Sequence, residues 1–548
     1  MSTSSEEYRR RRRTPVGWLV AGAVAVVAIV VIVVLASGGS GGDEKTAATQ
    51  PGTAGGGTLT SAALASPDPL DPQINSPTYA RAVRVNVYDP LVNYKPGGVD
   101  LQPALATSWD VSPDGLTYTF TLRKGVVFQD GKPMDSSDVQ ASYQRALHLK
   151  AQPSMGGIYL TDVASTAAPA PYTFVIKLKK RYGLFLGVVP KIAIVSADDL
   201  KAHGDSEAWF KDHANGTGPY AFTDYRRGTS YTLVRNPRYW GTLPKGAYDK
   251  IVVRVVPDSS SQAQQLERGG LDYGAGMTMR DIVAAAKAGG VKLVKPSPYP
   301  TMGLIGSLNA GRGPLSDIRV RQAIIAAFPY ADMKGFYQGF GLDPTNLLPS
   351  SWPGAKQFPA LHQDLAKAKQ LLSQAGYGPG KKSITLRYAA FQGLEDTRQA
   401  GLLLQDALRQ VGVKLTVDVL PFATFFAQAQ KQSTAPDISP GYESPETNDA
   451  FFWMRKLTGK DGFYNLTFTH DAALDATLDA GQAASDPAQQ QELLHKAQDL
   501  IQKDAVIIPM ANFDQPGIVS SHVDGVTRNF TELLDVPNYA TMFRGTSH

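Results

Sequence analysis

Apolar and polar residues alternate along several short runs of the chain, which is the pattern of strands with one buried face. The clearest runs are residues 117–123 (TYTFTLR), 172–178 (YTFVIKL) and 251–256 (IVVRVV). The first run follows the sequence SPDG at residues 112–115. There proline restricts φ, aspartate bonds locally and glycine accepts a positive φ. The pattern predicts strands separated by tight turns.

Other segments repeat their apolar residues at helical spacing. Asp364 is the predicted N-cap of one helix, which ends at Gly376. One face of this helix carries the apolar residues Leu365, Ala368, Leu371, Leu372 and Ala375. Residues 399–410 and 489–503 follow the same pattern. Because strands and helices occur in mixed order, the sequence predicts an α/β or α+β class with more than one sheet.

A third pattern lies near the N-terminus, where residues 14–42 contain no charged side chain. Within this stretch, residues 18–36 are almost continuously apolar, close to the ~20 residues that cross a bilayer. Arginines at 9–13 precede it, and the positive-inside rule keeps such a flank in the cytoplasm. We therefore predict a cytoplasmic basic tail at residues 1–15 and a transmembrane signal anchor at residues 16–36.

The apolar segment has a second possible fate, which is cleavage after Ala36 as a signal peptide. Retention is favoured because the segment exceeds the 7–15 residues of a usual signal-peptide core. Residues 37–57 are rich in glycine, serine and threonine, and they predict a flexible linker. Everything beyond the anchor is expected outside the cell, as a single-pass protein of the cell membrane.

Composition narrows the function classes. The 548 residues exceed one hydrophobic core, so at least two lobes are expected. The net charge is +5, and five arginines and two glutamates in residues 1–13 contribute +3 of it, which argues against a nucleic-acid-binding body. Cysteine is absent, which excludes disulfides, thiolate catalysis and lipidation of the N-terminal segment.

The sequence contains only weak matches to motifs for cofactor binding or metal binding. Gly216 and Gly218 loosely match a dinucleotide fingerprint, but Pro219 interrupts it and the following residues predict a strand, so a structural turn is favoured. His203 and His213 are close in sequence but are interpreted as surface residues rather than metal ligands. We therefore expect no catalytic residue, no metal site and no cofactor, and a protein that is not an enzyme.

Several segments in order resemble one family. Residues 88–94 read YDPLVNY, and residues 101–147 continue LQPALATSWDVSPDGLTYTFTLRKGVVFQDGKPMDSSDVQASYQRAL. GTGPY at 216–220, LVRNP at 233–237 and PLSDIRVRQA at 314–323 follow. This ordered set resembles the family 5 extracellular solute-binding proteins, which are the dipeptide-, oligopeptide- and nickel-binding components of ABC importers.

The resemblance implies an α/β, two-lobed fold like that of type II periplasmic binding proteins, with an extra inserted domain. Lobe I is expected to comprise residues 58–83, 215–298 and 505–548. An inserted subdomain is expected at residues 84–214, and lobe II at residues 299–504. Because the chain would cross between the lobes twice, a two-stranded hinge is expected.

The segment 437–453 (DISPGYESPETNDAFFW) corresponds to a region that lines the ligand cleft in this family. Tyr442 is expected either to line the cleft or to pack in the core. In peptide-binding relatives an aspartate three residues after this aromatic pairs with the peptide α-amino group, and here that position is Pro445. Glu443 and Glu446 lie nearby, either as charged ligand contacts from a shifted loop or as solvated loop residues.

Four further residues fall where the resemblance places other cleft residues, namely Met155, Asn309, Asn512 and Phe513. The resemblance thus implies a monomeric extracellular receptor that captures a peptide or other small solute and delivers it to ABC permease subunits. The alternative is a sensory or scaffold protein of the cell surface that has the same fold and no importer.

Overall fold

The computed structural model describes residues 56–74, 78–149, 154–204, 207–294, 302–378, 380–444, 446–527 and 536–545. The chain divides into two compact units, Met1–Thr53 and Ala54–His548, and all of these residues belong to the second unit. The predicted basic tail and signal anchor therefore lie outside the described residues. Among the helices that are described, none has the length and apolarity needed to cross a membrane.

A seven-stranded sheet forms the core of what we call the seven-stranded lobe. Its order is β12-β19-β11-β1-β10-β9-β8, with β1 parallel to β10 and β11 and the other pairs antiparallel. The strands are β1 (Thr58–Ala63), β8 (Tyr220–Arg226), β9 (Ser230–Arg235), β10 (Lys250–Val255), β11 (Tyr273–Gly274), β12 (Val291–Val294) and β19 (Gly517–Ser520). The predicted strand at 251–256 is confirmed as β10.

Helices cover this sheet because both of its faces are apolar. They are α1 (Thr78–Val87), α6 (Ser259–Glu267) and α7 (Met279–Ala288). Leu59 and Ala63 of β1 belong to one buried cluster, and Ala62 belongs to another together with residues of α6 and α7. The alternation of β1 thus places successive side chains in two different cores.

The turn before β8 needs glycine. A Cβ on Gly216 would lie 2.0 Å from the carbonyl oxygen of Val87, and one on Gly218 would lie 2.6 Å from its carbonyl carbon. Both glycines let the turn pack on the end of α1, and the strand β8 follows. The interpretation of this motif as a structural turn is confirmed.

A four-stranded antiparallel sheet, in the order β4-β5-β7-β6, is the centre of a second body, here called the four-stranded subdomain. Its main elements are β2 (Val92–Tyr94), β3 (Leu101–Pro103), β4 (Ala106–Val111), β5 (Thr117–Leu122), α2 (Ser136–His148), α3 (Met155–Tyr159), β6 (Val163–Ala170) and β7 (Thr173–Leu178). Short helices follow, namely η1 (Phe185–Gly187), η2 (Val189–Lys191), α4 (Ala197–His203) and α5 (Glu207–Phe210).

The predicted turn between β4 and β5 is confirmed in detail. The carboxylate of Asp114 accepts hydrogen bonds from the Ser112 hydroxyl at 2.5 Å and from the Leu116 amide at 2.9 Å. Gly115 has a φ of 71°, in the left-handed region that glycine tolerates. The strands predicted at 117–123 and 172–178 are confirmed as β5 and β7.

A six-stranded sheet, in the order β14-β18-β13-β17-β15-β16, forms the six-stranded lobe. Its strands are β13 (Met302–Leu308), β14 (Gly341–Leu342), β15 (Ile384–Phe391), β16 (Val413–Leu420), β17 (Ile438–Glu443) and β18 (Ile507–Phe513). The helices are η3 (Gly313–Ser316), α8 (Ile318–Ala327), α9 (Tyr330–Phe336), α10 (Leu365–Gln374), α11 (Glu395–Gln410), α12 (Phe422–Ala429), α13 (Ala450–Thr458), α14 (Ala472–Ala483) and α15 (Pro487–Asp504).

The helix predicted after Asp364 is confirmed as α10. The Asp364 carboxylate accepts a hydrogen bond from the Lys367 amide at 2.8 Å and so caps the helix. Ala368 and Leu372 of the predicted apolar face are buried, and Gly376 beyond the helix has a φ of 85°. The predicted helices at 399–410 and 489–503 are confirmed as parts of α11 and α15.

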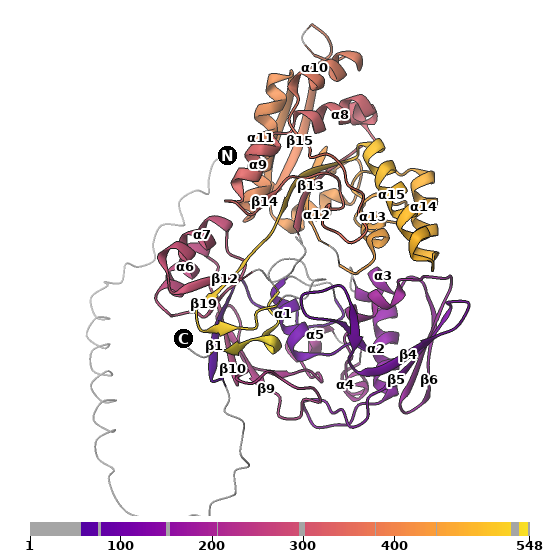
Figure 1. Ribbon diagram of the computed structural model, residues 1–548, viewed down its shortest axis with the longest axis vertical. Coiled ribbons are helices and arrows are strands. Elements are labelled where there is room, and N and C mark those ends of the chain that lie inside the picture. Colours follow the sequence, from indigo (N-terminus) through magenta and orange to yellow (C-terminus); the bar gives the residue numbers. More distant parts are fainter. Residues whose placement is uncertain are drawn as a thin grey trace, which may run out of the picture. The chain divides into compact units, whose positions relative to one another are not determined.

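The chain passes between the two lobes twice. It leaves the seven-stranded sheet after β12 and enters the six-stranded sheet at β13, and it returns between β18 and β19 (Figure 1). The sequence assigned residues from 505 onward to lobe I, but β18 lies in the six-stranded sheet. The reason is that β18 is fully buried and pairs with β13 on one side and β14 on the other. The C-terminal part ends with β20 (Val523–Asp524), η4 (Tyr539–Thr541) and β21 (Phe543–Arg544).

Candidate functional site

The connection between β17 and α13 carries three carboxylates and is called the acidic loop (residues 443–444 and 446–449). Glu443 is the last residue of β17, Glu446 lies within the loop, and Asp449 is the N-cap of α13. Asp449 accepts the Phe451 amide at 2.8 Å, which satisfies one of the free N–H groups at the start of the helix. The sequence thus concentrates negative charge where the helix begins.

Lys456, two turns into α13, neutralises much of this charge. Its Nζ lies 2.8 Å from Glu443 Oε2 and 3.0 Å from Glu446 Oε1. The side chains are 5% exposed for Lys456, 2% for Glu443 and 11% for Glu446, so the three charges lie together out of water. Glu443 Oε2 also accepts the indole N–H of Trp453 at 3.1 Å.

The surroundings shift the pKa values of the two glutamates in opposite directions. Burial raises the pKa of Glu443, although Lys456 counteracts this shift. Burial would also raise the pKa of Glu446, but Lys456, Lys191 and the Tyr159 hydroxyl outweigh it and lower the pKa to about 2. For Lys456, burial acts to lower the pKa, and the two glutamates raise it above its ordinary value. The ammonium and the Glu446 carboxylate are therefore both charged at neutral pH.

Three tyrosines of the four-stranded subdomain meet the acidic loop. The hydroxyl of Tyr159, at the end of α3, donates to Glu446 Oε2. The Tyr182 hydroxyl donates to Asp449 Oδ2 at 2.7 Å, and the Tyr94 hydroxyl accepts the backbone N–H of Asn448 at 2.9 Å. Each tyrosine thus bonds a different residue of the loop across the boundary between the two bodies.

Close backbone and ring contacts accompany these hydrogen bonds. The Gly183 N–H donates to the carbonyl of Gln482 at 2.7 Å, and the rings of Tyr159 and Phe452 stack with centroids 5.4 Å apart. A Cβ on Gly187 would lie 2.0 Å from Asn448 Oδ1, so the Asn448 side chain can approach this closely only because the residue is glycine. The four-stranded subdomain and the six-stranded lobe therefore meet closely at the acidic loop.

Strand register places two predicted site residues on one face of the six-stranded sheet. Glu443 and Asn512 both pair with Gly303 of β13, one from each neighbouring strand. Residues paired in this way point to the same face. A Cβ on Gly303 would lie 3.3 Å from Asn512 Oδ1, so the Asn512 amide lies over this glycine.

Tyr442 and Phe513 lie on the opposite face, with the hydrophobic core of α8 to α11. Tyr442 packs against that core while half-buried, and its hydroxyl donates to the half-buried carboxylate of Asp396. Tyr337 donates to the same carboxylate at 3.1 Å and stacks on Phe513 at 4.1 Å. Tyr442 thus packs against the core on one side, and its expected place in the ligand cleft stays a prediction.

The remaining predicted residues are spread further. Met155 is buried at the start of α3, one turn before Tyr159. Asn309 follows β13 at the end away from Gly303, and the six residue steps between them correspond to about 20 Å along the strand. Its side-chain amide donates to the Gln432 carbonyl at 3.3 Å. Pro445 lies outside the described residues, and the ligand roles of the seven residues stay predictions.

Sequence reasoning missed Lys456 and the three tyrosines. Lys456 lies ten residues after Glu446 and thirteen after Glu443, and no periodic pattern connects positions at those separations. The tyrosines come from a body whose contact with the loop is not visible in the sequence. One feature of the sequence could have indicated Lys456. In the helical sequence AFFWMRKLT this lysine falls on the otherwise apolar side, and a charge buried there requires a partner of opposite charge.

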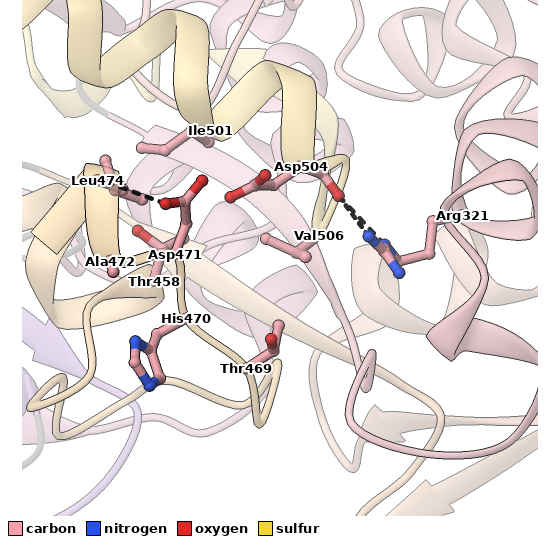
Figure 2. Close-up of a pocket in the computed structure, with 10 residues that line it drawn as sticks. All are labelled: Arg321, Thr458, Thr469, His470, Asp471, Ala472, Leu474, Ile501, Asp504 and Val506. Carbon is pink, nitrogen blue, oxygen red and sulfur yellow. Dashed lines mark hydrogen bonds between the residues drawn. The ribbon is translucent and has the colours of Figure 1, made fainter.

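A separate cavity of about 390 Å³ lies within the six-stranded lobe. Figure 2 shows the carboxylates of Asp471 and Asp504 turned toward each other in it, with the Arg321 guanidinium donating to the backbone carbonyl of Asp504 at 2.9 and 3.1 Å. Asp471 also caps α14. The residues that line this cavity include none of the seven predicted site residues.

Within the described part of the chain, histidine, aspartate and glutamate form no group of three suited to a metal ion.

Comparison with known proteins gives consistent results. Residues 100–465 match the bacterial extracellular solute-binding proteins, family 5 Middle. The glutathione-binding protein GsiB of Salmonella choleraesuis is 27% identical over 486 residues, covering 86% of this chain and 91% of GsiB. Helicobacter pylori DppA in complex with the peptide STSA is 25% identical, with a TM-score of 0.78 over 89% of this chain and 98% of DppA. Campylobacter jejuni NikZ in complex with Ni(L-His) is 21% identical, with a TM-score of 0.77 over 89% and 99% of the two chains, and shows the same fold.

Proposed function

Because the chain belongs to family 5 of the bacterial extracellular solute-binding proteins, we propose that it is the receptor subunit of an ABC importer, held at the outer face of the membrane by residues 16–36. The family consists of solute-binding receptors rather than enzymes. The receptor would capture a solute between the six-stranded lobe and the rest of the body and deliver it to permease subunits.

A peptide-like solute is the ligand class that we propose. The relatives are described as binding glutathione and the peptide STSA, and a third as holding Ni(L-His). All three ligands are small, polar and rich in carboxylate or amide groups. The buried polar residues Asn512 and Glu443, which share one face of the sheet beside Gly303, would suit such a ligand.

The observation that carries the proposal is the contact between the acidic loop and the three tyrosines. Each carboxylate in that contact also has a partner on its own side, since Lys456 holds Glu446 and Gln482 donates to Asp449 at 2.9 Å. Separation of the two surfaces would therefore leave neither carboxylate without a partner. An interface of this kind can open and close around a ligand at low cost.

The proposal is tested by native mass spectrometry of the freshly purified protein, which should retain a co-purified small solute. Addition of that solute should raise the melting temperature, because a ligand that binds only the folded state stabilises it. It should also change the fluorescence of Trp453, whose indole donates to Glu443. If peptides, sugars, opines and metal chelates all leave both signals unchanged, the sensory or scaffold alternative is favoured.

The anchor is tested separately by protease treatment of intact cells. The proposed topology predicts that the body is removed from the cell surface while the membrane fraction keeps a short N-terminal fragment. A body that survives on intact cells and is digested only after lysis would contradict the proposed orientation.

A further inference from the structure

A positive charge of the protein itself already lies between the two glutamates of the acidic loop. The Lys456 ammonium is 2.8 Å from Glu443 and 3.0 Å from Glu446, and its side chain is 5% exposed. Trp453 and Tyr159 each donate a further hydrogen bond to one of these carboxylates. Both glutamates therefore have ionic and hydrogen-bonding partners before any ligand binds.

A second lysine, from the four-stranded subdomain, also balances the negative charge of the two glutamates. Lys191, in η2 of the four-stranded subdomain, contributes to the lowered pKa of Glu446. Its Nζ lies 5.8 Å from the ring centre of Tyr159, the same tyrosine that donates to Glu446. When the two surfaces meet, the negative charges of Glu443 and Glu446 are balanced by lysines from both sides.

A ligand ammonium has no suitable place beside this group. If it entered next to the glutamates, it would lie within a few ångströms of the Lys456 ammonium, and two like charges repel strongly where water is excluded. If it displaced Lys456, that lysine would be buried without an anion, because its side chain is only 5% exposed. An acylated or otherwise uncharged group meets neither obstacle.

We propose that Lys456 is a specificity-determining residue, a built-in counter-ion that excludes ligands presenting a free ammonium to the acidic loop. The receptor then takes peptide-like solutes whose amino end is acylated or otherwise uncharged. This inference rests on the proposed function and defines the ligand class at the same site. It differs from a role of Glu443 or Glu446 as the anchor for a ligand amine.

The test compares a tripeptide library with its N-acetylated counterpart, in competition, on the full-length protein in detergent micelles by native mass spectrometry. The preferred sequence and its acetylated or free twin are then measured by calorimetry. The unaltered protein should prefer the acetylated twin by roughly 10-fold or more, the size expected when a buried charge lacks a partner. Lys456→Met should reverse the preference, because a ligand ammonium then replaces the missing charge.

Lys456→Arg is the matched control, since it keeps the positive charge and should keep the preference for the acetylated twin. Thermal denaturation of each variant establishes that it is folded. If Lys456→Met fails to fold, Lys456→Gln takes its place, because an amide can still donate to one glutamate. The reversal expected for Lys456→Gln has the same direction.

Three results would overturn the inference: preference of the unaltered protein for the free-amine twin, an equal preference in the unaltered and uncharged variants, or binding of neither library by any folded variant. The last result leaves the proposed function intact if a co-purified solute of another class is found. Without such a solute and without any thermal shift, the proposed function fails as well. The two failures are thereby distinguished.

Discussion

The four-stranded subdomain has two polar interfaces that are built differently. Toward the seven-stranded lobe, the Arg145 guanidinium of α2 makes two hydrogen bonds with the Asp71 carboxylate, at 2.6 and 2.9 Å, and lies over the Phe210 ring. Toward the six-stranded lobe, hydroxyl groups of Tyr159 and Tyr182 donate to carboxylates that also have partners in their own lobe.

The difference lies in what separation would leave behind. Parting Arg145 from Asp71 would expose a buried, paired charge, because their side chains are 3% and 1% exposed. Parting a tyrosine from the acidic loop would leave a neutral hydroxyl on one side and a carboxylate still paired on the other. The first interface is suited to a permanent junction and the second to the opening and closing of the proposed receptor.

The largest expected effect follows from the permanent junction. Arg145→Met should lower the free energy of unfolding by about 3–5 kcal/mol, because it leaves the Asp71 carboxylate buried without a cation. Chemical denaturation of the purified protein measures this loss. Arg319→Met is the matched control, since Arg319 also bonds an aspartate through two nitrogens but is 46% exposed, and it should change stability by less than about 1 kcal/mol. Equal losses in the two variants would contradict the contrast.

A pH effect should also come from the permanent junction. Asp89 is buried there, where it accepts hydrogen bonds from Thr217 and Trp240, and burial raises its pKa from 3.8 to about 6. The folded protein therefore binds this proton more tightly than the unfolded chain. The stability contributed by the protonated carboxyl is fully present below pH 3.8 and is lost as the pH rises through about 6.

Asp89→Asn should remove this dependence, which corresponds to a change on the order of 2–3 kcal/mol across the window. Denaturation midpoints measured between pH 4 and pH 7 check the prediction. Asp130→Asn, at a carboxylate on the exposed surface that pairs with Lys132, is the control and should leave the profile nearly unchanged. If the Asp89→Asn variant keeps the full pH dependence, the source lies elsewhere.

At the separable interface, tyrosine hydroxyls should affect ligand affinity more than stability. Tyr159→Phe and Tyr182→Phe each remove a hydrogen bond to a carboxylate, for which about 1.5–3 kcal/mol is expected. Calorimetry with the co-purified solute should show weaker binding, while the ligand-free melting temperature changes little. Tyr118→Phe should show the reverse, because its hydroxyl donates to the Tyr182 carbonyl within the four-stranded subdomain. A large stability loss for Tyr159→Phe would indicate that this interface is also permanent.

The smallest effect is expected at Gly187. A methyl group there would lie 2.0 Å from Asn448 Oδ1, but this atom ends a side chain that can rotate away. Gly187→Ala should therefore weaken ligand binding by roughly 3- to 10-fold, about 1 kcal/mol. Asn448→Ala in the same protein should restore binding. Gly335→Ala, at a position with open space around the added carbon, is the control and should bind as the unaltered protein does.

Much of the local structure was predictable because its causes are local. The turn at 112–115, the strand β5 and the helix α10 each depend on residues close in sequence, and the structure confirms them. The site was predictable only in part. Glu443 and Asn512 meet through Gly303, whereas Tyr442 packs against the core and Asn309 lies at the other end of β13.

The sequence by itself determined the family, the mixed α/β class, the charge of the acidic loop and the candidate anchor, because these depend on composition and on ordered motifs. The tertiary structure alone decided that Lys456 neutralises the two glutamates and that β18 belongs to the six-stranded sheet. It also decided which tyrosines meet the loop. The physical reason is that strand register and the packing of separate bodies depend on contacts between residues far apart in the chain, and a one-residue change of register would turn each side chain to the other face of the sheet.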